Sequence, residues 1–206
     1  MNKSRLEAFS DGVFAIVITL LILDVRVPKV PYEQLPQALL SLLPNVFSYA
    51  LSFIIVGLYW ISHHNMLLLI HRVDRPTLWI NILLLLFVGF IPFPAALMAE
   101  YPLHTVPVVL YGCALLASNA VGYTAWVYAA TGRRLLKPDV TDRRIRAMHI
   151  SFLAVNVSYV IAIGMAFVYV PASYAIFVFV IAIFIIPKPW DPPVNEAREV
   201  QSEQAG

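Results

Sequence analysis

Apolar residues along the chain gather in six long windows that are separated by short polar or proline-containing segments. A helix needs about 20 mostly apolar residues to cross a bilayer, and each window approaches or exceeds that length. The pattern therefore predicts an all-α integral membrane protein with six transmembrane helices per chain. The predicted spans are residues 6–25, 45–70, 77–99, 106–130, 147–169 and 172–187.

The composition agrees with a membrane protein. Hydrophobic residues make up 60% of the 206 residues and charged residues only 13%, whereas a soluble domain has roughly 45–50% apolar and about 25% charged residues. The net charge of +2 and the single cysteine, Cys113, argue against nucleic-acid binding, a disulfide framework and a thiolate metal site. We expect one channel-sized membrane domain over residues 1–187 and a polar, disordered cytoplasmic tail over residues 188–206.

Basic residues are unevenly distributed among the segments between the spans. All but two of the 14 Lys and Arg residues, Arg26 and Lys29, fall on one side if the N-terminus is cytoplasmic. The positive-inside rule therefore places both termini in the cytoplasm, in a cell membrane. The basic segment 132–146 contributes most of this bias, and binding of anionic lipid is an alternative role for it.

Asp11 is the unusual residue of the first span, because a charge inside a membrane helix normally needs a partner. Counted from the cytoplasmic helix ends, Asp11 lies about 8 Å deep, His63 and His64 about 9–11 Å, and Asn81 about 6 Å. We therefore expect an interhelical network of Ser10, Asp11, His63 or His64, and Asn81, joined by Arg5 or Arg72. Alternatively, the histidines sit near the headgroups and Asp11 reaches back to water.

The first span also has an apolar face. At about 100° per residue, one narrow stripe collects Arg5, Phe9, Gly12, Ile16, Leu20 and Leu23, with Asp11 roughly opposite. Periodicity alone does not separate a pore lining from an ordinary packing face.

Three stretches make the chain resemble the transmembrane protein 175 family of potassium channels. They are Arg5-x-x-x-Phe9-Ser10-Asp11, then Trp60-Ile61-Ser62-His63-His64-Asn65, and the run from Asn81 to Pro94. The resemblance implies a homotetramer in which the first helix of each chain lines a central pore that conducts potassium. It implies a constriction of Ile16, Leu20 and Leu23, no cofactor and no TVGYG filter. The similar letters Val121-Gly122-Tyr123-Thr124 fall in the middle of the fourth predicted span.

Apolar rings of this kind can gate by dewetting and give modest selectivity, since potassium loses water more readily than sodium. Thr19 and Asp24 are possible polar contributors to the pore, although threonine in a helix often bonds its own backbone. One alternative is a proton-coupled secondary transporter that uses Asp11 and His63 or His64. Two further alternatives are an enzyme or haem protein that uses the His pair, and a scaffold without transport.

Overall fold

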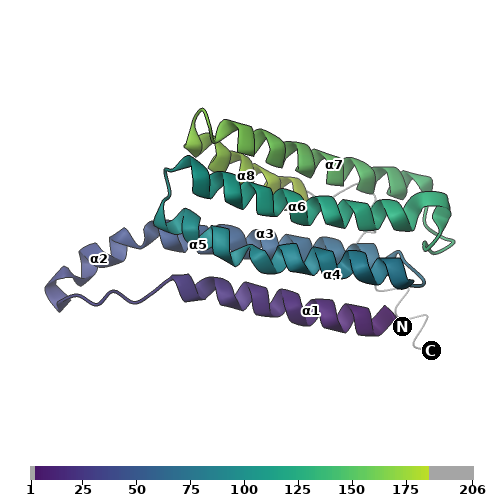
Figure 1. The fold of residues 1–206 in the computed structure, drawn as a ribbon, viewed down its shortest axis with the longest axis horizontal. Coiled ribbons are helices and arrows are strands. Elements are labelled where there is room, and N and C mark those ends of the chain that lie inside the picture. The colour runs from purple at the N-terminus through teal and green to yellow at the C-terminus, as the bar shows by residue number, and fades with distance from the viewer. Residues whose placement is uncertain (1–2, 186–206) are drawn as a thin grey trace.

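The structure is a computed structural model that describes residues 3–185, and in that part of the chain it is almost entirely helical (Figure 1). The long helices run side by side as a bundle, with α1 and α7 at opposite edges. The α-helices are α1 (Lys3–Leu20), α2 (Leu35–Ser41), α3 (Leu43–Leu68), α4 (Arg75–Phe90), α5 (Pro92–Glu100), α6 (Thr105–Ala130), α7 (Asp142–Met165) and α8 (Val170–Ile185). The 3-10 turns are η1 (Leu21–Asp24), η2 (Tyr32–Gln34) and η3 (Thr131–Arg133).

Five helical stretches within residues 3–185 are long and apolar enough to cross a membrane. The all-α membrane fold is thus confirmed. The sixth predicted span corresponds to α8, whose 16 residues rise only about 24 Å, less than the roughly 30 Å of bilayer hydrocarbon. Its crossing of the membrane stays a prediction, and the predicted tail 188–206 lies outside the described residues.

Two helices differ from the sequence pattern. The span predicted at 77–99 is built from α4 and α5, which meet at Ile91. Pro92 opens α5 because proline lacks an N–H donor and clashes with the carbonyl four residues earlier. The short helix α2 lies in the segment after the first span that we expected to be a plain connection, and it extends beyond the end of the bundle (Figure 1).

The basic loops meet at the end of the bundle where α1 begins (Figure 1). The backbone N–H of His71 donates to the Leu135 carbonyl at 3.0 Å, and that of Lys137 donates to the Leu69 carbonyl at 2.9 Å. These two bonds join the α3–α4 loop to the α6–α7 loop. The charge asymmetry in the sequence therefore corresponds to one physical end of the molecule.

Asp74 starts α4 at this end. Its carboxylate accepts bonds from the Thr77 backbone N–H at 3.1 Å and from the Tyr128 hydroxyl at 2.6 Å. Burial would raise the pKa of Asp74, but the bonds from Tyr128 and Thr77 outweigh it and hold this pKa below its ordinary value. The same carboxylate therefore caps α4 and ties it to α6.

Close packing of α6 against α7 depends on a glycine. A Cβ atom at Gly112 would lie 2.7 Å from Cγ1 of Ile163, closer than carbon atoms approach without strain. Beside this contact, the buried Tyr59 hydroxyl bonds the Leu115 carbonyl at 2.8 Å and the Tyr159 hydroxyl at 3.0 Å. Polar bonds thus join α3, α6 and α7 inside an otherwise apolar core.

Candidate functional site

The first helix has a buried face and an exposed face, and the two faces carry different chemistry. Leu6, Ser10, Phe14 and Val17 are buried against the rest of the chain. The predicted stripe lies on the other side, where Ile16 is 59% exposed, Leu20 45% and Leu23 64%. These three apolar residues are available to contact other molecules.

The stripe continues to both ends of the helix. Arg5 and Phe9 are exposed on it, and a Cβ atom at Gly12 would have no other atom within 4 Å. Leu23 lies in the 3-10 turn η1 and not in α1 itself, yet it stays on the exposed side.

A hydrogen-bonded cluster holds the buried face of α1. His63 on α3 donates through Nε2 to Asn81 Oδ1 on α4 at 2.8 Å. Asn81 Nδ2 donates to Ser10 Oγ at 3.1 Å, and the Ser10 hydroxyl donates to the Leu6 carbonyl at 2.9 Å. All three side chains are buried. The cluster links α1, α3 and α4 in one layer, and each of its three side chains donates a hydrogen bond.

Asp11 is not a member of this cluster, which corrects the network expected from the sequence. Its Oδ1 accepts a bond from the indole Nε1 of Trp60 at 2.8 Å, and the residue is exposed. Adjacent helical residues point about 100° apart, so burying Ser10 turns Asp11 to the flank of the helix. His64 is also outside the cluster, exposed and stacked on Trp60 with ring centroids 5.9 Å apart.

In the described structure, neither arginine proposed for the network joins it. Arg5 is exposed, and Arg72 donates to the Arg134 carbonyl at 3.3 Å in the loop region. Trp60 is the partner of Asp11 that sequence reasoning missed. The helix bounds of the structure explain this pairing, because Asp11 and Trp60 each lie eight residues from the ends of α1 and α3, at about 12 Å along each helix, whereas the predicted span ends placed the two residues at different depths.

The two polar residues near the C-terminal end of the first span differ in position. The Thr19 hydroxyl donates to the Ile16 carbonyl at 2.8 Å, which satisfies its proton and leaves its oxygen lone pairs on the exposed side. Asp24 is half-buried and lines a small cleft together with Asn45 and Tyr49.

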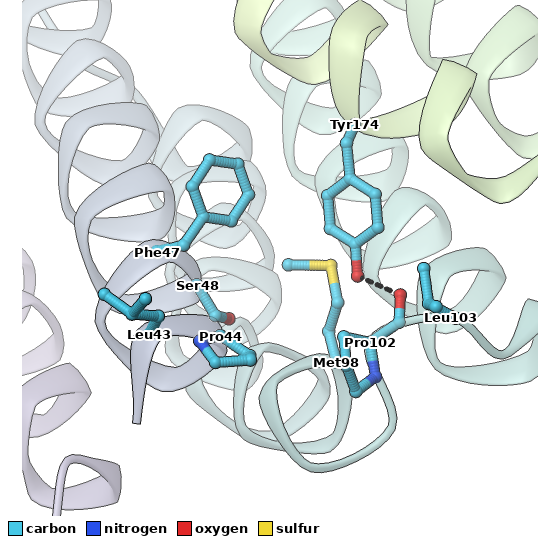
Figure 2. Close-up of a pocket in the computed structure, with 8 residues that line it drawn as sticks. All are labelled: Leu43, Pro44, Phe47, Ser48, Met98, Pro102, Leu103 and Tyr174. Atoms are coloured by element: carbon cyan, nitrogen blue, oxygen red, sulfur yellow. Dashed lines mark hydrogen bonds between the residues drawn. The ribbon is translucent and has the colours of Figure 1, made fainter. Parts of the chain in front are cut away.

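Two other regions are poorer candidates for a functional site than the exposed stripe of α1. Residues 121–124 lie inside the continuous helix α6, where helical hydrogen bonds occupy backbone carbonyls. A cavity of about 350 Å³ opens between α3, the α5–α6 turn and α8 (Figure 2). Its walls are mainly apolar, and its hydroxyls on Ser48 and Tyr174 already donate to the Ala95 and Pro102 carbonyls at 2.7 and 2.6 Å.

Comparison with known proteins gives consistent results. The family model described as the endosomal/lysosomal potassium channel TMEM175 matches residues 5–92. A potassium channel of Streptomyces collinus is 37% identical over 181 residues, which cover 85% of this chain and 88% of that protein. An animal relative, the endosomal/lysosomal proton channel TMEM175 of Gallus gallus, is 40% identical over 110 residues, which cover 49% of this chain but only 22% of that protein.

A solved structure extends the match to the whole fold. The crystal structure of a lysosomal potassium-selective channel TMEM175 homolog from Chamaesiphon minutus superposes with a TM-score of 0.78 at 34% identity. The superposition covers 88% of this chain and 95% of that one. These relatives are named as channels and not as enzymes. With its apolar helices, its Arg5 to Asp11 motif and this coverage, the chain belongs to the TMEM175 family of potassium channels.

Proposed function

We propose that four copies of this chain assemble around their α1 helices and form a potassium-permeable cation channel. Ile16, Leu20 and Leu23 then form stacked apolar rings around the central path. The observation that carries this proposal is that all three residues are exposed in the single chain, along one side of the first apolar span formed by α1 and η1. The names of the bacterial relatives as potassium channels support the choice of ion.

The chemistry of the rings defines the mechanism. Aliphatic side chains offer no oxygen to replace an ion's water, so closely spaced rings close the path by dewetting. Conduction requires the rings to part, and selectivity then reflects the smaller dehydration cost of potassium compared with sodium. Thr19 adds an oxygen acceptor beside the Ile16 ring, because its proton is committed to the Ile16 carbonyl. Asp24 places a carboxylate near the outer mouth.

The buried cluster has a positioning role in this scheme. Bonds among Ser10, His63 and Asn81 fix the rotation of α1 against α3 and α4. Because Ser10 is held inward, the stripe about 120° around the helix is held outward, toward the proposed axis. The basic end is cytoplasmic in this arrangement, and the channel lies in the cell membrane with both termini inside.

Flux through liposomes tests the position of the constriction. Ile16→Asn should wet the narrowest ring and raise the potassium leak several-fold over the unmodified protein. Ile82→Asn is the matched control, since Ile82 is 49% exposed on α4 and lies away from the stripe. Equal flux in the two variants would show that the constriction is not at Ile16. A reversal potential with potassium and sodium on opposite sides measures selectivity.

Proton transport is the second candidate, because the Gallus gallus relative is named a proton channel. For this chain, a proton-coupled transporter would use Asp11 with His63 or His64. Among the described residues no hydrogen bond joins Asp11 to either histidine, as its bond goes to Trp60. Potassium flux that saturates and stops without a proton gradient would favour this candidate over the channel.

A further inference from the structure

A surface with a basic part and an apolar part runs along α7, on the edge of the bundle opposite α1 (Figure 1). Two arginines at its basic end and four apolar residues repeat at intervals of three and four positions, which places them on one helix face. The apolar members are between 47% and 67% exposed. We call this surface the α7 track; it consists of Arg143, Arg146, Ile150, Leu153, Val157 and Val160.

Within the described part of the chain, the arginines of the α7 track lack acidic partners. Among residues 3–185, neither Arg143 nor Arg146 forms an ion pair or a side-chain hydrogen bond. The nearby acid Asp142 is engaged by Arg133 at 2.6 Å. Glu7 pairs with Lys3 at 3.5 Å, and Asp74 is bonded by Thr77 and Tyr128. As far as residues 3–185 are concerned, the two guanidinium groups are therefore available to bind an external anion.

The apolar part of the track has the length of one leaflet. From Ile150 to Val160 the helix rises about 15 Å, which is half of the roughly 30 Å hydrocarbon core. The opposite face of α7 packs inward through Ala147, Val155 and Tyr159. If α1 faces the central axis, as proposed above, α7 faces lipid.

We propose that the α7 track binds an anionic phospholipid of the cytoplasmic leaflet. Charge complementarity selects the headgroup, since Arg143 and Arg146 present planar N–H forks that match a phosphate. The exposed aliphatic residues below them contact the acyl chains of the same molecule. A zwitterionic lipid has the same chains, but its own cation cancels the attraction of the arginines.

Melting of the full-length protein in detergent tests this proposal with defined lipids. Phosphatidylglycerol should raise the melting temperature by several degrees more than phosphatidylcholine with the same acyl chains. Arg143→Gln/Arg146→Gln should reduce the phosphatidylglycerol effect to the phosphatidylcholine level. Arg26→Gln/Lys29→Gln removes the same charge at the other end of the bundle and should keep the full effect.

Soluble glycerol phosphate separates headgroup binding from lipid binding and should give no shift. A phosphatidylglycerol effect that survives in Arg143→Gln/Arg146→Gln, or that glycerol phosphate reproduces, would overturn the proposal. Native mass spectrometry gives a second measurement, because it counts the phosphatidylglycerol molecules that stay bound after washing with mixed lipids. Arg143→Gln/Arg146→Gln should retain fewer of these molecules per chain than the unmodified protein. These measurements need no ion flux, so their failure is distinct from failure of the proposed channel.

Discussion

Replacing Asn81 by leucine isolates the polar cluster that fixes the first helix. Asn81 is 5% exposed and lies between two partners, accepting from His63 at 2.8 Å and donating to Ser10 at 3.1 Å. Leucine branches at the same atom and is not smaller than asparagine, so Asn81→Leu removes both bonds without opening a cavity. Ser10 keeps its bond to the Leu6 carbonyl, whereas the His63 N–H loses its acceptor.

The expected cost follows from these two different losses. A hydrogen bond between membrane helices contributes about 0.6 kcal/mol on average, and a stranded buried donor costs about 1–3 kcal/mol. We therefore expect Asn81→Leu to lower the free energy of unfolding by about 2–4 kcal/mol. Most of that cost comes from the unsatisfied imidazole and not from the lost bond to Ser10.

A double-mutant cycle distinguishes this explanation from a general packing defect. His63→Phe removes the stranded donor. A phenylalanine ring suits this position because the centroid of the Phe14 ring already lies 5.7 Å from that of the imidazole. The combined His63→Phe/Asn81→Leu protein should regain about 1–2 kcal/mol relative to the sum of the single changes. Unfolding free energies in mixed micelles measure these terms, with Asn65→Leu on the exposed side of α3 as the matched control. Additive effects, or a cost equal to that of Asn65→Leu, would refute the role of the cluster.

Two further changes test the packing and the loop end. Gly112→Ala places a Cβ 2.7 Å from Ile163 and should cost about 1–3 kcal/mol, whereas Gly164→Ala, which has open space, should not lower the melting temperature. Asp74→Asn keeps an N-cap for α4 but loses the charge bonded by Tyr128. The native pKa of Asp74 is below the ordinary 3.8. The unmodified protein should therefore be more stable than Asp74→Asn above about pH 4, and it should lose this advantage as the pH falls through the lowered pKa. Melting temperatures of the two proteins at pH 7 and pH 3 test this.

Much of the fold follows from one-dimensional pattern because the bilayer imposes a length on every span. The apolar stripe of Ile16, Leu20 and Leu23 was predictable for the same reason, since helical periodicity alone sets which residues share a face. Pattern did not show that the prolines divide the third span into α4 and α5 at Ile91. A proline-containing span can kink or break, and neighbouring helices determine which occurs.

The polar layer shows what the sequence pattern alone does not predict. Depth counted along the helices correctly suggested that Ser10, His63 and Asn81 share a layer, and the structure brings them together. Depth does not fix the rotation of each helix, so Asp11 was assigned to the same cluster although it lies 100° away. Its bond to Trp60 at 2.8 Å required the relative rotation of α1 and α3.

That rotation connects the buried cluster to the proposed pore. Turning α1 by one residue position, about 100°, would replace Ser10 with Asp11 beside Asn81 and point Ile16 about 100° away from its present direction. The turned state would bury a carboxylate that is now exposed and bonded to Trp60, and unpaired burial of a charge is expensive. Ser10 and Asp11 therefore act as a pair, one selecting the inward orientation and the other excluding the alternative. If the channel opens by parting its apolar rings, as proposed, it has to tilt or bend α1, because rotating α1 would break this pair.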